Sequence, residues 1–206
     1  ATASVDKTVH IWSSNFGSSL ALLRGHTSSV VDVEWSPNGT KVVTASEDST
    51  ACIWSGITGE QLFTLKGHTS AVKHVSWSPD GTKVATAGAD GKACIWSSVT
   101  GERLLTLSGH VGWISKVSWS PDGTTVATAG EDKTALTWSS TTGELLSTLT
   151  GHTYAVSDVS WSPDGLKIAT ASWDGSACIW ESSTGNLLLN LREHTDAVYA
   201  VVWSPD

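Results

Sequence analysis

Short apolar runs alternate with turn-forming residues along the whole chain. In residues 67–108, apolar runs at 72–77, 83–87, 93–96 and 104–107 are separated by Ser-Pro-Asp-Gly, Asp-Gly and Thr-Gly. The runs are rich in β-forming residues, and each is too short for an ordinary helix. Pro and Gly in the intervening segments favour tight turns. The pattern therefore predicts four short antiparallel strands joined by tight turns in each stretch of this length.

The same pattern recurs every 42 residues. One histidine series and two tryptophan series carry the period: His26, His68, His110, His152 and His194; Trp35, Trp77, Trp119, Trp161 and Trp203; Trp12, Trp54, Trp96, Trp138 and Trp180. A fixed period of this size indicates a repeat architecture, in which each small sheet buries its faces against its neighbours. The units are 25–66, 67–108, 109–150 and 151–192, and a fifth unit is split between 193–206 and 1–24.

Each unit resembles a blade of a WD-repeat β-propeller, with Gly67-His68 at its start and Trp96 at the end of its third strand. The Asp that follows this Trp in the family is Ser or Glu here, and Glu193 replaces the Gly expected before His194. The resemblance implies an all-β propeller of five four-stranded antiparallel blades. Two arrangements fit, a closed five-blade ring or an arc of a larger ring. Because the family's usual ring has seven blades, we favour an arc, or half of an assembly with another chain.

A histidine, a threonine, an aspartate and a tryptophan recur together in every unit. A hydroxyl, an imidazole and a carboxylate are also the groups of a hydrolase triad. An active site occurs once, however, and this set occurs in each unit, which favours a structural role. The resemblance implies a hydrogen-bonded chain from the indole through the hydroxyl and the imidazole to the carboxylate. The sets are His26, Thr44, Asp48 and Trp54; His68, Thr86, Asp90 and Trp96; His110, Thr128, Asp132 and Trp138; His152, Thr170, Asp174 and Trp180; and, in the split unit, His194, Thr2, Asp6 and Trp12.

The positions at which the units differ predict a binding surface. The resemblance places three positions of each unit on the narrow top face of a propeller. Trp113 and Trp173 are the only tryptophans outside the periodic series, and Tyr154 and Tyr199 are the only tyrosines. Exposed aromatic side chains on a rigid surface usually mark recognition, although they could instead fill the central channel. The predicted partner-binding set is Val31, Glu47, Lys73, Trp113, Glu131, Tyr154, Trp173 and Tyr199.

The function that fits best is a non-enzymatic scaffold that presents this top face to a protein or peptide. Trp113 and Glu131 share one rim and together suit a Lys or Arg side chain, through cation–π attraction and a charge-assisted hydrogen bond. The alternative is a lectin-like propeller whose rim tryptophans stack on sugars. An enzyme would need a cluster of non-repeated ionisable residues with shifted pKa values, and the sequence offers only scattered ones. No cofactor is predicted.

Charge and composition narrow the range of partners. The net charge of −8 argues against nucleic acid, and no apolar run approaches the length of a membrane span. The histidines lack the local spacing of metal ligands, so no metal site is predicted. Cys52, Cys94 and Cys178 occupy equivalent positions and should be free and buried, which predicts a reducing, cytoplasmic location. An open arc would expose apolar blade edges, so we also expect self-association.

Overall fold

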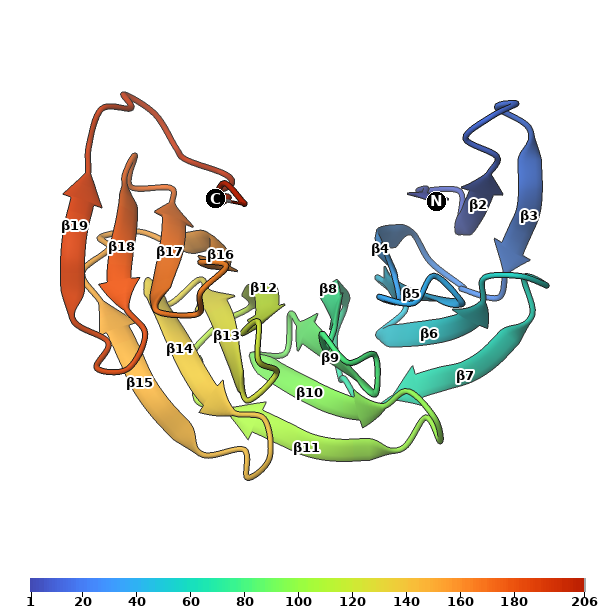
Figure 1. Cartoon of the computed structure of the whole chain (residues 1–206), viewed down its shortest axis with the longest axis horizontal. Helices are drawn as coiled ribbons and strands as arrows, with labels where there is room; N and C mark the ends of the chain where they lie inside the picture. Colours follow the sequence, from blue (N-terminus) through green and yellow to red (C-terminus); the bar gives the residue numbers. More distant parts are fainter. Residues whose placement is uncertain (206) are drawn as a thin grey trace.

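The computed structural model describes residues 1–205, and every regular element among them is a β-strand. The strands form four four-stranded sheets and one three-stranded sheet, with antiparallel pairing. The sheets follow one another around an open arc, and the two chain ends face each other across its gap (Figure 1). In the described part of the chain, no helix has the length and apolar character that crossing a membrane requires.

The four complete sheets are the blades of a β-propeller, and in each the strands run in sequence order from the inside of the arc outwards (Figure 1). The first blade comprises β4 (Val30–Trp35), β5 (Lys41–Ser46), β6 (Thr50–Ser55) and β7 (Gln61–Lys66). The second comprises β8 (Val72–Trp77), β9 (Lys83–Gly88), β10 (Lys92–Ser97) and β11 (Arg103–Ser108). The third comprises β12 (Ile114–Trp119), β13 (Thr125–Gly130), β14 (Thr134–Ser139) and β15 (Leu145–Thr150). The fourth comprises β16 (Val156–Trp161), β17 (Lys167–Ser172), β18 (Ala177–Glu181) and β19 (Leu187–Leu191).

The Ser-Pro-Asp-Gly segment joins the first two strands of a blade through a hydrogen-bonded turn. In the second blade, the Ser78 hydroxyl donates to the Asp80 carboxylate (2.6 Å) and accepts from the backbone N–H of Lys83 (2.9 Å). Gly81 has a φ of +70°, a left-handed conformation that glycine adopts without strain. The turn therefore fixes the register of the first hairpin from local sequence alone.

A bulge near the start of each innermost strand shapes the top face of the arc. In the second blade, the register of β8 against β9 shifts between Val72 and His74. The other three blades have the same irregularity in β4, β12 and β16. A bulge adds one residue and turns its side chain away from the regular ladder. The added residues are Val31, Lys73, Ser115 and Ser157, which lie at the edge that we call the top face.

The hydrophobic core is divided among the interfaces between successive sheets. Val43 and Ala45 of the first blade pack in one cluster with Val75 and Val84 of the second. Similar clusters join the second blade to the third and the third to the fourth, and another joins the N-terminal sheet to the first blade. Each sheet thus buries its faces on its neighbours, as a repeat architecture requires.

The three cysteines lie inside the blades. Cys52, Cys94 and Cys178 are free and buried. Burial raises the pKa of the Cys52 thiol to about 11, so it remains protonated at neutral pH. These thiols therefore act as small packing groups, and the cytoplasmic location that they suggest stays a prediction.

The split unit does not assemble into one blade. Its N-terminal part forms the three-stranded sheet of β1 (Thr2–Ala3), β2 (Thr8–Trp12) and β3 (Ser19–Arg24), at one end of the arc. Its C-terminal part, 193–205, contains no strand and lies at the other end, against the fourth blade (Figure 1). The fifth unit is thus present as a three-stranded sheet and a separate first-strand segment, and the propeller is an open arc, one of the two arrangements that the sequence predicts.

The C-terminal segment nevertheless occupies the place of a first strand. The backbone N–H of Val201 donates to Asp158 (3.0 Å), as Val75 does to Asp32 (3.0 Å). The indole of Trp203 donates to the carbonyl of Ser160 (3.1 Å), which matches the bonds from Trp77, Trp119 and Trp161 to the preceding blade. Contacts with the fourth blade thus hold the segment in the position of a first strand. Among the described residues, no second strand lies beside it to form the hydrogen-bond ladder of a β-strand.

Candidate functional site

Each complete blade contains the hydrogen-bonded chain implied by the resemblance. In the second blade, the Trp96 indole N–H lies 2.9 Å from the Thr86 hydroxyl, to which it donates. The same hydroxyl lies 2.7 Å from His68 Nε2, and His68 Nδ1 lies 3.1 Å from the Asp90 carboxylate. The chain therefore crosses the blade from β10 through β9 to the loop before β8.

Equivalent chains cross the other complete blades with similar distances. The imidazole-to-carboxylate distances are 2.8 Å for His26 and Asp48, 2.9 Å for His110 and Asp132, and 3.1 Å for His152 and Asp174. The indole-to-hydroxyl distances are 2.9 Å for Trp54 and Thr44, 2.9 Å for Trp138 and Thr128, and 2.8 Å for Trp180 and Thr170. The four threonine side chains have no exposed surface. A substrate therefore cannot reach the hydroxyls, which argues against a hydrolase triad.

Electrostatics in these chains favour a charged carboxylate. Burial by itself would raise the pKa of Asp90, but hydrogen bonds from the backbone N–H of Thr69 and from His68 outweigh it and lower the pKa. The same balance lowers the pKa of the equivalent carboxyls, Asp48, Asp132 and Asp174. A charged carboxylate accepts the Nδ1–H of the imidazole, which leaves Nε2 to accept the threonine proton.

Two of the imidazoles, those of His110 and His152, are held in the neutral form. Burial lowers the pKa of His110 and of His152 below the ordinary value, although the neighbouring carboxylates act in the opposite direction. A neutral ring has one donor and one acceptor nitrogen, which matches a carboxylate on one side and a hydroxyl on the other. Every polar group of the chain thus has a partner of the right kind.

The split unit holds only part of its set. The Trp12 indole donates to the Thr2 hydroxyl (2.8 Å), as in the complete blades. Asp6 accepts from the hydroxyl and backbone N–H of Thr8 (2.6 and 3.0 Å), as Asp48 does from Thr50. His194, however, lies beside Gly175 of the fourth blade. The structure therefore does not bring His194 to the other three residues.

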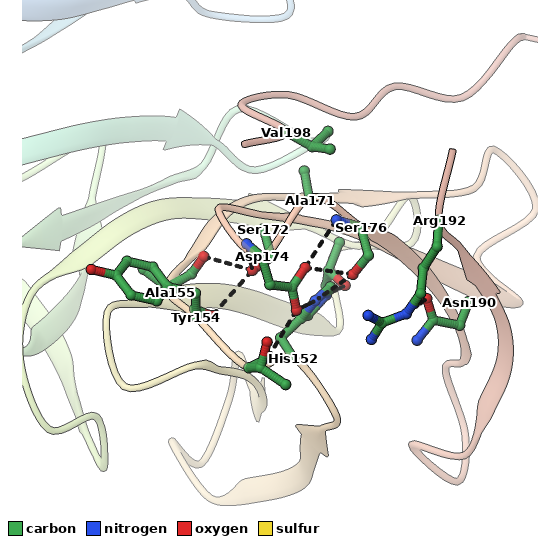
Figure 2. A network of polar contacts seen from close by, with 12 residues as sticks. His152, Tyr154, Ala155, Ala171, Ser172, Asp174, Ser176, Asn190, Arg192 and Val198 are labelled. Atoms are coloured by element: carbon green, nitrogen blue, oxygen red, sulfur yellow. Dashed lines mark hydrogen bonds and ion pairs between the residues drawn. The ribbon is translucent and has the colours of Figure 1, made fainter. Parts of the chain in front are cut away.

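In the fourth blade, the buried chain also fixes the loops of the top face (Figure 2). Asp174 accepts the backbone N–H of Thr153 (2.8 Å), and the Ser172 hydroxyl donates to the carbonyl of Ala155 (2.9 Å). The loop that carries Tyr154 is thus held from below by buried polar groups. Side chains on this loop are consequently presented by a rigid support.

Four aromatic side chains meet on the top face over the third and fourth blades. Trp173 is at the centre, with ring centroids 6.4 Å from Trp113, 6.2 Å from Tyr154 and 6.4 Å from Tyr199. The side chains are 40% (Trp173), 38% (Trp113), 56% (Tyr154) and 71% (Tyr199) exposed. We call this group the aromatic cluster. The structure thus brings together four residues that the sequence marks separately.

Two hollows flank the aromatic cluster. One, of about 330 Å³, is lined by Lys73, Trp113, Ser115 and Trp173. The other, of about 300 Å³, is lined by Trp113, Glu131, Lys133, Tyr154, Ala155 and Trp173. Glu131 accepts the backbone N–H of Trp113 (3.4 Å), so its carboxylate is anchored at the edge of the second hollow.

Lys133 was not marked by the sequence, although it lines the same hollow as Glu131. It has a φ of +70° in the turn after β13, a position at which the second and fourth blades have Gly91 and Gly175. A lysine at a position where two other blades hold glycine was the available signal, because it adds a long cation to a tight turn at the rim.

The remaining predicted residues lie beside the cluster or apart from it. Lys73 Nζ is 3.9 Å from Glu47 Oε1, so these two side chains form a weak exposed ion pair between the first and second blades. Glu47 therefore faces Lys73 and lines neither hollow. Val31 is exposed at its bulge but likewise lines neither hollow.

The sequence analysis did not predict a group of ionisable side chains on the innermost strands. Asp32, His74, Lys116 and Asp158 occupy equivalent positions in the four blades, and together with Glu34 they line a cavity of about 440 Å³. His74 lies 3.5 Å from Asp32, and Lys116 lies 3.4 Å from Asp158. The available signal was the change of residue at a fixed place in the repeat.

These carboxylates hold successive blades together. Asp32 bonds to the innermost strand of the next blade, and Asp158 bonds to the C-terminal segment that takes the same place. Glu34 accepts the backbone N–H of Trp77 (2.7 Å). Burial raises the pKa of Glu34 to about 7 and lowers the pKa of His74 to about 4. Because the carboxylate oxygens are engaged in bonds between blades, we interpret the group as structural rather than catalytic.

Comparison with known proteins agrees with this architecture. The family model described as WD domain, G-beta repeat matches residues 17–55, 59–97, 101–139 and 143–181, more than half of the chain. No curated protein matches the sequence. Each family match covers the third strand of one unit and ends with the residue after its periodic tryptophan, such as Ser97. The chain therefore belongs to the WD40 repeat family, whose members generally act as non-enzymatic scaffolds for protein interactions.

Proposed function

We propose that this chain binds a peptide or protein segment on the aromatic cluster of its top face. The observation that carries the proposal is the position of Trp173, whose ring contacts three other exposed aromatic rings. Clustered exposed aromatic side chains are typical of interaction hot spots, because burying them removes a large apolar area from water.

Rigid presentation supports the same proposal. Trp173 follows β17, and its backbone N–H donates to the carbonyl of Ala155 (3.0 Å) in the loop before β16. The adjacent Asp174 is tied to His152 and Thr153 in the buried chain. A surface that is already ordered loses little conformational entropy when it binds, so more of the interaction energy becomes affinity.

We propose further that the bound segment carries a Lys or Arg side chain. Its cation would lie against the ring of Trp113 while the exposed Glu131 carboxylate accepts its hydrogen bond. Lys133 lines the same hollow and opposes a cation there. The contribution of charge to peptide affinity is therefore measurable by substituting Glu131 and Lys133 one at a time.

The test is an array of short peptides that differ only in a central Lys, Arg, Glu, Phe or Ala, applied to the full chain beside an array of sugars. We expect Lys and Arg peptides to bind the parent and to lose at least tenfold in affinity with Trp173→Ala. A matched control is Val99→Ala, an exposed side chain of an outer turn. Binding of sugars with no binding of peptides would support the lectin-like alternative and contradict our proposal.

We also propose that two copies of the chain complete each other at the ends of the arc. In the complete blades, the first strand pairs with the second, whereas β1 has only β2 beside it. At the other end, 197–203 is placed as a first strand without a second. The segment of one copy beside β1 of another would bring His194 to Thr2, Asp6 and Trp12 and extend the sheet to four strands.

A further inference from the structure

The groove between the third and fourth blades differs from the two preceding grooves. It lies at the end of the strands opposite the aromatic cluster, beside the turn after β12. One position of the outermost strand faces the groove that its own sheet forms with the next blade. This position is Ala21, Phe63, Leu105 and Ser147 in successive units. The repeat therefore allows the grooves to be compared with one another inside the same molecule.

Large side chains fill the two preceding grooves. Phe63 packs on the core between the first and second blades, and Leu105 packs on the core between the second and third. The periodic tryptophans in these cores are almost completely buried, with 5% exposure for Trp77 and 7% for Trp119. In the third groove the residue is Ser147, and Trp161 is only partly buried. The smaller side chain thus leaves part of this indole uncovered.

A second sequence difference removes a long side chain from the same groove. Lys41 and Lys83 cross the preceding grooves, where Nζ donates to the carbonyls of Ser98 (2.7 Å) and Ser140 (3.2 Å) in the next blade. Thr125 takes their place in the third blade and cannot reach so far. The result is a pocket of about 520 Å³ between the blades, whose lining includes Thr125, Ser147 and Trp161.

The lining of this pocket suits an apolar occupant. Leu146, Trp161 and Leu166 form apolar walls, and Leu166 is 65% exposed where the other complete blades have threonine. Two of the lining hydroxyls already have partners: Ser120 donates to Asp122 (2.6 Å), and Ser182 donates to the carbonyl of Gly165 (2.8 Å). Because these hydroxyls are engaged, the pocket offers apolar contact more than hydrogen bonds.

The groove beside the N-terminal sheet shows why a small residue alone is not enough. There Ala21 leaves Trp35 partly buried in the same way. The first blade has Gly56 in the turn after its third strand, and a Cβ added to Gly56 would collide with the Trp35 ring. The ring itself therefore occupies the space that a side chain at position 56 would take. The fourth blade has Ser182 at the equivalent position, whose side chain keeps that space filled.

We propose that the pocket between the third and fourth blades binds a Phe or Leu side chain of a peptide segment. The side chain takes the place that Phe63 and Leu105 take in the preceding grooves and covers the exposed part of Trp161. The site is independent of the aromatic cluster, because it lies on the opposite face of the arc.

The experiment follows the indole N–H signals of tryptophan-labelled full-length protein by NMR, with Trp161 assigned from Trp161→Phe. The probes are the blocked tripeptides Ala-Phe-Ala and Ala-Leu-Ala, with Ala-Ala-Ala as the control. We expect a saturable shift of the Trp161 signal with the first two probes and none with the third. No saturable shift of this signal, or an equal shift with Ala-Ala-Ala or with glucose, would overturn the proposal.

Variants that exchange residues between equivalent positions of two grooves provide matched controls. Ser147→Leu combined with Thr125→Lys gives this groove the residues of the preceding one, and we expect it to fold and to weaken binding at least tenfold. Leu105→Ser should open a second site, so that the Trp119 signal also shifts. If Leu105→Ser does not fold, the filled variant still decides: an unchanged Trp161 shift in it would show that the probe binds elsewhere.

Discussion

The indole N–H of Trp96 donates to the hydroxyl of Thr86 at 2.9 Å, at a depth where the threonine has no exposed surface. This bond is the inner end of a chain that continues through His68 to Asp90. Buried polar groups stabilise a fold only when all of them have partners. The repeated set is therefore a single structural unit, and loss of one member affects the others.

We predict that Asp90→Ala and Trp96→Phe each lower the free energy of unfolding by about 1–3 kcal/mol. Asp90→Ala removes the acceptor for His68 and for the backbone N–H of Thr69 (2.9 Å), and Trp96→Phe removes one donor from a buried hydroxyl. Urea unfolding at neutral pH measures the change, with the exposed Glu102→Gln as control. Unfolding of Asp90→Ala at the parent's midpoint would contradict the structural role.

Stability should fall as the pH is lowered from 7 towards 4. The pKa of His110 and of His152 lies below the unfolded value, and so do the pKa values of the four aspartates bonded to the repeated histidines. The unfolded chain therefore binds more protons, first at its histidines near about 6.5 and then at its carboxyls near about 4. Thermal unfolding across this range measures the loss. A melting temperature that rises on acidification would contradict the assignment of neutral imidazoles.

Glu34 should act in the opposite direction. Burial raises its pKa to about 7, so the folded protein keeps a proton that the unfolded chain releases above about 4.5. Its contribution to stability is thus fully present at low pH and is lost as the pH rises through 7. We expect Glu34→Gln, whose carbonyl can still accept from Trp77, to be more stable than the parent at pH 8 by about 1–2 kcal/mol. An equal stability difference at pH 5 and pH 8 would show that Glu34 is not protonated in the fold.

Charge near the aromatic cluster should tune the affinity for a cationic peptide. Glu131→Gln should weaken binding of a Lys peptide from the array three- to thirtyfold, and Lys133→Gln should strengthen it, because the first removes attraction and the second removes repulsion. Titration calorimetry at low and at high salt measures both effects. Trp113→Ala that abolishes binding, while Glu131→Gln and added salt change nothing, would refute the cationic preference and favour sugar stacking.

The chain should form particles larger than its own 21.6 kDa at high concentration. Light scattering after size exclusion measures the mass. His194→Ala should weaken association about tenfold for each newly completed set, because each set loses about 1.4 kcal/mol, whereas the outer-turn variant Phe16→Ser should not. A strict monomer at every concentration would instead favour a closed five-blade ring.

Much of the fold follows from local sequence. The runs at 72–77 and 83–87 become β8 and β9 because β-forming residues end at a turn that Ser78, Asp80 and Gly81 close by themselves. The 42-residue spacing then repeats that unit, and the division of cores between blades follows because one sheet cannot bury both faces alone. The buried chain of His68, Thr86, Asp90 and Trp96 is equally local, since all four belong to one blade.

Only the tertiary structure decided how the blades relate to one another. The angle between neighbouring blades sets whether the ring closes, and it depends on side-chain packing across each groove rather than on any local run. The same packing places Trp113, Tyr154 and Tyr199 around Trp173, from loops that are far apart in sequence. It also leaves Trp161 uncovered beside Ser147. Such contacts depend on pairs of residues in different blades, and the sequence alone does not state which pairs meet.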